Sequence, residues 1–209
     1  MTVTTEDFEK LPVVPYSQAR NTPDGLRTGD ILLFHSTDFG SEMTEIFTDS
    51  LWCHAAFVWN IAEADRVLLL ESVEKIGVRA MPMSAKINGS PASPKPYGGG
   101  LLVVRHDDMA LHPDPAKVHA MTEFALDRIG YPYSQQELNS IMERIALAKI
   151  GAIVEGRLDP KNQFICSEYA ASCLHAMGIV LAPDKLGFIA PGDIARDPKM
   201  KAVWSLRHD

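Results

Sequence analysis

The sequence is poor in cysteine, with three in 209 residues and none in a Cys-x-x-Cys pair. An odd, widely spaced set does not form the disulfide framework typical of small secreted proteins. We therefore expect free thiols and a reducing compartment. Each cysteine then has to be interpreted either as a packing residue or as a reactive group.

Long hydrophobic runs are also missing. No segment reaches the roughly 18 consecutive apolar residues that a membrane-spanning helix needs. The first residues, MTVTTEDFEKLPVVPY, have neither the basic start nor the apolar core of a secretory signal. The sequence therefore predicts a cytoplasmic protein without a transmembrane segment, although a signal trimmed from it, or a non-standard export route, would leave no trace here.

Positive charge is in the minority, and the net charge is -7. The chain thus lacks the basic surface with which proteins hold nucleic acid, and no nucleic-acid partner is expected. A composition of 46% hydrophobic and 22% charged residues is ordinary for a soluble globular protein. A length of 209 residues suits one domain better than two, and nothing here fixes the oligomeric state.

Short β-like runs fill much of the first half of the chain, and helical patterns fill the second. The expected strands cover residues 31–34, 54–60, 66–73, 75–83 and 101–107, and the expected helices lie within 41–50, 114–130, 135–154 and 166–178. Neighbouring strands separated by short polar or glycine breaks favour a meander. The sequence therefore predicts an α+β fold with a mostly antiparallel sheet packed by helices.

Residues 84–100, SAKINGSPASPKPYGGG, are rich in proline and glycine and show no periodicity. This composition predicts a loop. A loop of this length inside a compact domain is often functional. Two interpretations stay open, a lid over a site and a mobile surface segment.

A histidine and a glutamate stand on neighbouring predicted strands. Side chains alternate between the two faces of a strand. In the predicted strand 54–60 this places His54 among apolar residues, and in the predicted strand 66–73 it leaves Glu71 as the one charge on an otherwise apolar face. A buried carboxylate without a partner is costly, so we expect a contact between Glu71 and His54 across adjacent antiparallel strands. Arg79 or Lys75 is the alternative partner of Glu71, and His54 is equally explained as a core residue.

Cys166 stands at the predicted start of a helix. A thiol attacks as a thiolate, which a helix N-terminus and a nearby imidazolium both stabilise. Brought together, Cys166, His54 and Glu71 would act as nucleophile, base and orienting residue, with the Cys166 amide holding an oxyanion. Against this, Cys166, Cys173 and Met177 share one helical face, a pattern that core packing also explains.

A metal site is a further possibility for these side chains. Cys53, His54, Glu71 and Cys166 are all ligand types, but their spacing matches no recognised zinc pattern. Alternation also sends Cys53 and His54 to opposite faces. No metal and no other cofactor is therefore expected.

Six stretches, taken in order, resemble the circularly permuted papain-like branch of the NlpC/P60 superfamily, called YiiX-like or YaeF-like. They are GDILLF, HAAFVW, LLESVEKIGVRAMPM, IGYPYS, CSEY and IAPGDIARDPKMKAVW. As in that branch, the histidine strand precedes the cysteine helix. The resemblance implies a single catalytic domain over residues 25–209, with a small barrel-like sheet, after a lead-in of residues 1–24.

The resemblance implies that Cys166 is the nucleophile, His54 the general base and Glu71 the residue that orients the histidine. Tyr133 is expected to line the site, where its hydroxyl would serve as a donor, and Glu168 is expected to be structural. One position departs from the family, because Cys53 stands where a small polar residue usually precedes the histidine. This departure leaves two alternatives open, oxidative pairing of Cys53 or a second thiol near the site.

Such a triad performs acyl transfer on an amide, ester or thioester through an acyl-thioester intermediate. The resemblance implies a cysteine amidase or peptidase whose partner molecule is a peptidoglycan-type peptide or another amide. The alternative is acyl-lipid hydrolysis or acyl transfer, for which the apolar residues 145–154 offer a hint that core packing explains equally well. A catalytically silent binding module is the third interpretation.

Overall fold

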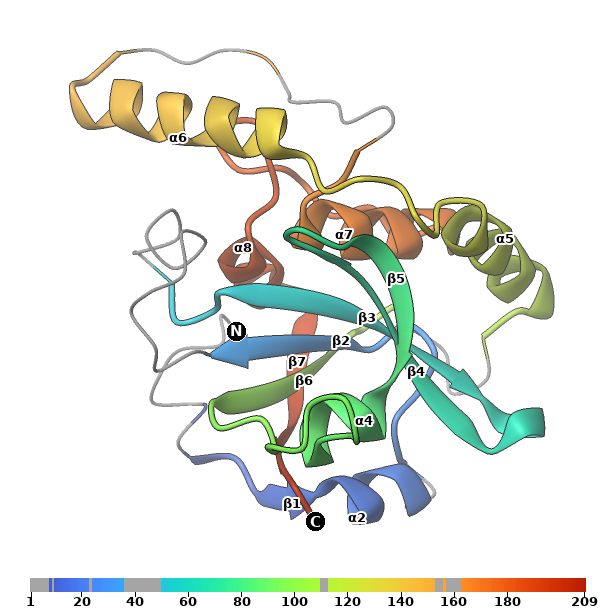
Figure 1. Ribbon diagram of the computed structural model, residues 1–209. Helices are drawn as coiled ribbons and strands as arrows, with labels where there is room; N and C mark the ends of the chain where they lie inside the picture. Colours follow the sequence, from blue (N-terminus) through green and yellow to red (C-terminus); the bar gives the residue numbers. More distant parts are fainter. Residues whose placement is uncertain are drawn as a thin grey trace.

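The computed structural model describes residues 8, 10–22, 24–35, 50–109, 113–152, 156 and 163–209. At its centre lies a seven-stranded sheet in the order β1-β7-β6-β2-β3-β4-β5 (Figure 1). The strands are β1 (Val13–Pro15), β2 (Ile31–His35), β3 (His54–Ile61), β4 (Arg66–Val73), β5 (Gly77–Pro82), β6 (Gly100–His106) and β7 (Met200–Arg207). All neighbouring pairs are antiparallel except β1 with β7, which confirms the mostly antiparallel α+β fold.

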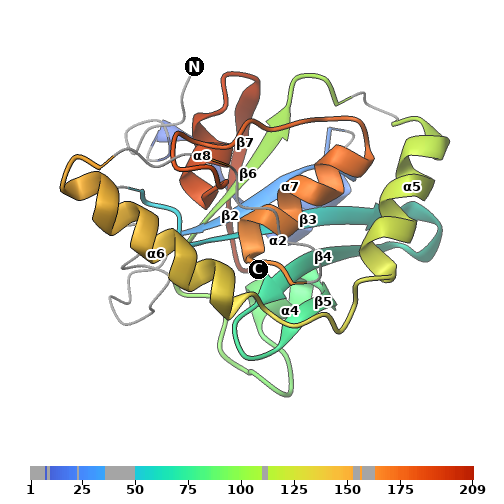
Figure 2. The same ribbon diagram turned by 90° about the horizontal axis from the view of Figure 1, so that it is seen from above.

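Helices cover both faces of this sheet. They are α2 (Tyr16–Asn21), α4 (Met83–Asn88), α5 (Pro115–Leu126), α6 (Gln135–Lys149), α7 (Cys166–Ala176) and α8 (Pro191–Arg196), with the 3-10 turn η1 (Ala62–Ala64). Helices α5, α7 and α8 pack on one face, and α2 and α4 pack on the other (Figures 1 and 2). Among the described helices, none combines the length and apolar character needed to cross a membrane.

The central strands are apolar because both of their sides are covered. In β3, Ala55 and Phe57 join the core under α7, whereas Ala56 and Val58 join the core shared with α2 and α4. The four residues 31–34 of β2 are all buried between its two neighbouring strands and the two layers of helices. A strand enclosed in this way has no solvent side and therefore reads as a continuous apolar run.

The structure corrects the loop expected over residues 84–100. Helix α4 covers the first five residues of this segment, 84–88, and begins one residue earlier. Met83 and Ile87, one turn apart, are buried against the sheet. Pro82 is the N-cap residue, and its non-helical backbone, with φ of -58° and ψ of 127°, is typical of that position. A helix of six residues shows too little periodicity to stand out from the proline and glycine that follow it.

Other elements also go beyond the sequence-based expectation. Strand β7 and helix α8 have no counterpart among the elements expected from the sequence, and α2 and α4 place helices in the first half of the chain. The expected lead-in, residues 1–24, contributes β1, which pairs with β7, and α2, which buries Tyr16 and Ala19. The helix expected within residues 41–50 lies outside the described residues, apart from Ser50.

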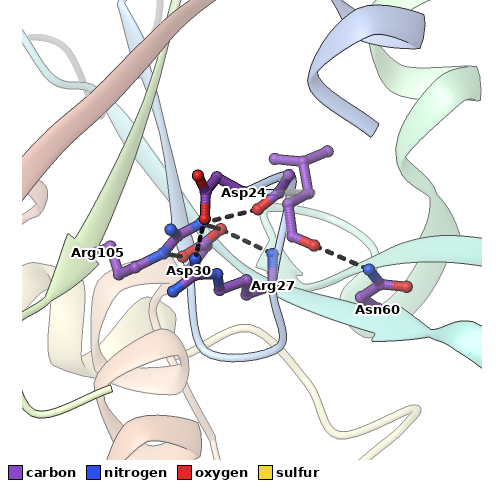
Figure 3. A network of polar contacts seen from close by, with 7 residues as sticks. Asp24, Arg27, Asp30, Asn60 and Arg105 are labelled. Carbon is purple, nitrogen blue, oxygen red and sulfur yellow. Dashed lines mark hydrogen bonds and ion pairs between the residues drawn. The ribbon is translucent and has the colours of Figure 1, made fainter. Parts of the chain in front are cut away.

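A buried ion pair fixes the start of β2 (Figure 3). The Asp30 carboxylate accepts hydrogen bonds from Arg105 Nε at 2.6 Å and Nη2 at 2.8 Å, and from the Arg27 backbone N–H at 2.9 Å. Nearby, Asn60 Nδ2 donates to the Leu26 carbonyl at 2.8 Å. These bonds tie the turn before β2 to strands β3 and β6, so the Gly-Asp of the opening motif has a structural role.

Replacing Asp30 by Asn should destabilise the fold, because it leaves the mostly buried Arg105 guanidinium without its counter-charge. We expect the free energy of unfolding to fall by about 3 kcal/mol, measured by urea denaturation. The control is Asp24→Asn, which removes an exposed ion pair with Arg27 and should change the same quantity by less than about 0.5 kcal/mol. Equal losses in the two variants would contradict the structural role of Asp30.

Candidate active site

The candidate site forms where β3 begins and where β4 carries its single acidic residue. Phe57 pairs with Leu70 across these strands, and continuing the register places His54 diagonally opposite Glu71 on the same face. Diagonal neighbours in an antiparallel pair lie within reach of long side chains. His54 Nε2 lies 2.7 Å from Glu71 Oε2, so the contact expected from the sequence is present.

The Glu71 carboxylate has no exposed surface and bonds two cationic groups. Its other oxygen, Oε1, accepts hydrogen bonds from Arg79 Nε at 2.8 Å and Nη2 at 2.6 Å. Arg79 stands directly opposite Glu71 on β5. The two partners considered from the sequence, His54 and Arg79, are therefore held together, while Lys75 lies in the exposed turn between β4 and β5.

These contacts move both pKa values in directions that keep the pair charged. Burial of the His54 ring acts to lower its pKa, but the charge and hydrogen bond of Cys166, with those of Glu71, outweigh burial and raise it to about 9. Burial of Glu71 acts to raise its pKa, but the hydrogen bond and charge of His54, with the charges of Lys86 and Arg79, lower it to about 2. At neutral pH these pKa values give a protonated His54 ring beside an ionised Glu71 carboxylate.

Cys166 is the first residue of α7, and its side chain contacts His54. Because Nε2 of the ring is engaged by Glu71, Nδ1 is the nitrogen left for the thiol. Its N-cap residue, Ile165, makes no side-chain capping bond, and the N–H groups in the first turn of a helix have no partner within the helix. Cys166 has no exposed surface, whereas Cys173 and Met177, further along the same face, lie in the core under the sheet.

A carbonyl just before α7 anchors the segment that leads into Cys166. The Phe164 carbonyl accepts a hydrogen bond from the Ser72 hydroxyl at 2.7 Å and another from the Ser134 N–H at 3.3 Å. Ser72 follows Glu71 on β4, so the two side chains point to opposite faces of the sheet. Consecutive residues of one strand thus hold the histidine on one side and the cysteine segment on the other.

A glycine turn places the Tyr133 segment. Gly77 has a φ of +86°, and a side chain there would collide with the Tyr131 carbonyl. The Val78 N–H donates to that carbonyl at 2.8 Å, and Gly130 N–H donates back to the Val78 carbonyl at 2.9 Å. Gly77 therefore leaves room for the backbone segment that leads to Tyr133, and Val78 bonds that segment.

The remaining residues singled out from the sequence lie around this centre. Tyr133 is half-buried, and burial followed by the charge of Cys166 raises the pKa of its hydroxyl, which keeps it a proton donor. Glu168 Oε1 accepts the buried Ile189 N–H at 2.8 Å, in line with a structural role. The Cys53 thiol donates a hydrogen bond to the Phe34 carbonyl oxygen, 3.3 Å from its sulfur.

Two residues of the site were missed in the sequence. Ser72 gave no signal beyond its position next to Glu71. Lys86 lies over the rings of Phe34 and Tyr97, at 5.1 Å and 5.9 Å from their centroids, and the Phe34 ring is 5.0 Å from that of His54. Lys86 lies on α4, whose residues were expected to form a loop because of the proline and glycine that follow them. The sequence therefore could not assign Lys86 to a helical face.

Neither a protein-family model nor a curated protein matches the sequence. Among solved structures, the chain is similar to the crystal structure of metalloprotein yiiX from Escherichia coli O157:H7, with a TM-score of 0.55 over 85% of this chain and 98% of that chain. The fold is YiiX-like. At 15% sequence identity this likeness concerns the fold alone, a permuted papain-like arrangement in which the histidine strand precedes the cysteine helix.

The YiiX neighbour is described as a metalloprotein, which raises the question of a metal here. In the part of the chain that the structure describes, no group of three or more His, Cys, Asp or Glu side chains could hold a metal ion. Both oxygens of Glu71 already bond His54 and Arg79. The described residues of the site therefore do not fit a metal centre.

The raised pKa of His54 predicts a specific dependence of stability on pH. Below the ordinary value of 6.5 the ring is protonated in both folded and unfolded chains, so its contribution is fully present. Between 6.5 and about 9 only the folded chain keeps the proton, so the contribution is lost as pH rises. His54→Ala should remove this decline, which amounts to at most about 3 kcal/mol in the free energy of unfolding.

The measurement is urea denaturation of wild type and His54→Ala across pH 6 to 10. The control is His119→Ala, since His119 is exposed on α5 and only approaches Glu123, at 3.5 Å. It should keep the wild-type slope. A wild-type slope in His54→Ala would show that the His54 ring does not hold its proton through these contacts.

Proposed function

We propose that the protein is a cysteine hydrolase that cleaves an amide substrate through an acyl-thioester on Cys166. The observation that carries this proposal is the position of the His54 ring, which contacts Glu71 on one side and Cys166 on the other. Papain-like acyl transfer requires a nucleophile that contacts a base, and a base that contacts an orienting residue. Cys166, His54 and Glu71 follow one another in this order.

The first half of the reaction forms the thioester. The Cys166 thiolate attacks the substrate carbonyl carbon, and the carbonyl electrons move to oxygen. The backbone N–H of Cys166 at the helix start and the protonated Tyr133 hydroxyl are the donors proposed for this oxyanion. The His54 imidazolium then gives its proton to the leaving amine as the carbon–nitrogen bond breaks.

The second half returns the free enzyme. Neutral His54 takes a proton from water, the resulting hydroxide attacks the thioester, and the carbon–sulfur bond breaks to release the acid and the thiolate. The Glu71 carboxylate accepts the hydrogen bond from Nε2 of His54. This bond orients the ring with Nδ1 toward the sulfur and, in the neutral ring, keeps the proton on Nε2. Arg79 occupies the second oxygen of Glu71 and so keeps its first oxygen aimed at His54.

The burial of Cys166 adds a step before the chemistry. Because the residue has no exposed surface, a substrate carbonyl reaches the sulfur only after a covering group has moved. Opening of this kind commonly precedes chemistry in enzymes with closed sites. The rate of substrate capture is then set partly by this opening.

Acyl-lipid substrates stay as the second candidate because of side chains on and after α6. Ile145 packs on the core cluster that includes Ile165, next to Cys166, but Met142, Leu147 and Ile150 are exposed, so core packing explains only part of the apolar character of this segment. Exposed apolar side chains on a helix that packs against the residue before Cys166 are suited to a fatty acyl chain. Comparing amide with ester and thioester substrates separates the two candidates.

Thiol alkylation tests the proposed nucleophile directly. With limiting iodoacetamide between pH 6 and 7, we expect Cys166 to react at least about tenfold faster than Cys173, and His54→Ala to remove that advantage. Cys173 is the internal control, because it lies on the same helix, is equally buried, and has a pKa that burial raises. Mass spectrometry of the labelled peptides gives both rates in one sample.

Equal and slow labelling of Cys166 and Cys173 in the wild-type protein would instead identify a silent binding module. A fast Cys166 whose rate is unchanged in His54→Ala would remove His54 as the group that activates it. The rate of Cys173 reports general opening of α7, so a loss of folding in a variant is recognised from the same spectra.

The role proposed for Tyr133 is tested by Tyr133→Phe. Loss of one donor to the oxyanion should lower kcat at least about tenfold and leave KM nearly unchanged, on whichever amide, ester or thioester of a screened panel is cleaved. Tyr131→Phe, two residues away, is the matched control and should retain activity. A Tyr133→Phe enzyme with full kcat would show that this hydroxyl does not contact the reacting oxygen.

A further inference from the structure

A groove of about 960 Å³ opens on the α4 side of the sheet, next to the candidate active site. We call it the basic groove, after three cationic residues of its lining, Arg79, Lys86 and Lys95. Ser90, Ser93 and Tyr97 are among the other lining residues. Its volume lies in the range of roughly 300 to 1,000 Å³ that is usual for ligand pockets.

The charge of this lining is one-sided. Its described lining residues include three cations and no carboxylate, in a chain whose net charge is -7. Within the described part of the chain, neither Lys86 nor Lys95 forms a salt bridge. Arg79 gives Nε and Nη2 to Glu71, and its Nη1 has no hydrogen-bond partner among the described residues.

The basic groove is joined to the catalytic side chains by direct contacts. Arg79 lines the groove and bonds the carboxylate that holds His54. Lys86 lines the groove and lies over the Phe34 ring, which packs on His54. A molecule in the groove is thus separated from the candidate triad by single side chains.

We propose that the basic groove binds an oxyanion of the substrate, a carboxylate or a phosphate, and that the hydrolase therefore prefers acidic substrates. The statement about substrates rests on the proposed function, whereas anion binding does not. Guanidinium and ammonium groups are the usual partners of such oxyanions. The segment 84–100, longer than a simple connection requires, supplies two of the three cations.

Balancing the charge of Glu71 is the competing explanation for these cations. Lys86 and Arg79 serve that purpose in part, because their charges lower the pKa of Glu71. Lys95 is not among the groups that shift Glu71, and it is exposed on the groove wall. Lys95 is therefore the residue whose removal reports on a ligand in the groove and leaves the triad as it is.

Isothermal titration calorimetry with inorganic phosphate and with citrate tests anion binding. It is carried out on the wild-type protein and on Cys166→Ala, which lacks the proposed nucleophile, because anion binding does not depend on the reaction. We expect saturable binding, weakened about threefold by Lys95→Gln and about tenfold by Lys86→Gln. Lys117→Gln and Lys185→Gln remove the same charge at exposed positions outside the groove lining. Both controls should bind as wild type does.

The pattern across variants decides the proposal. Tighter binding of phosphate than of citrate points to a phosphate ester, and the reverse points to a carboxylate. An absence of saturable binding, or an equal loss in Lys95→Gln and the two controls, would overturn the basic groove as an anion site. Thiol alkylation is measured separately, so a failure of the groove and a failure of the nucleophile are told apart.

A second arm links the groove to substrate choice. Among paired substrates that differ only by a terminal carboxylate or phosphate, the charged member should have the higher kcat/KM, and Lys95→Gln should reduce that ratio about threefold, the factor expected for anion binding. Wild-type enzyme that cleaves both members equally well would show that the anion bound in the groove is not part of the substrate.

Discussion

The buried charge of Glu71 is the constraint around which the candidate active site is arranged. A carboxylate without exposed surface is stable only where cations and donors compensate it. His54 and Arg79 do so from the strands on either side of β4. One of these cations belongs to the candidate triad and the other to the basic groove, so a single charge couples the proposed reacting centre to the proposed recognition site.

Strand β4 serves as a divider because successive side chains point to opposite faces. Glu71 faces the side of α4, where it meets its two cations. Ser72 faces the other way and holds the Phe164 carbonyl, two residues before Cys166. Cys166, the first residue of α7, thus lies beside His54, the first residue of β3, and two neighbouring residues of β4 hold the two segments in place.

Much of this arrangement can be predicted from the sequence, namely the elements that have a local pattern of apolar and polar residues. The alternation of residues 66–73 predicts β4, and its one charge on an apolar face predicts the contact with His54. Elements whose identity depends on tertiary packing are not readable in this way. Helix α4 is too short for its period to emerge, so Lys86 could not be placed, and β7 is defined by its partners rather than by its own pattern. The catalytic roles of Cys166, His54 and Glu71 remain predictions.

The hydrogen bond between Ser72 and Phe164 joins residues 92 positions apart, and this has a consequence for the order of folding. Closing a chain segment of that length costs conformational entropy before any contact compensates it. The hairpins of β3, β4 and β5 form from local contacts, whereas α7 docks only after this long closure. A partly folded chain therefore lacks the contact between Cys166 and His54, and the candidate site of newly made protein is complete only after α7 has docked.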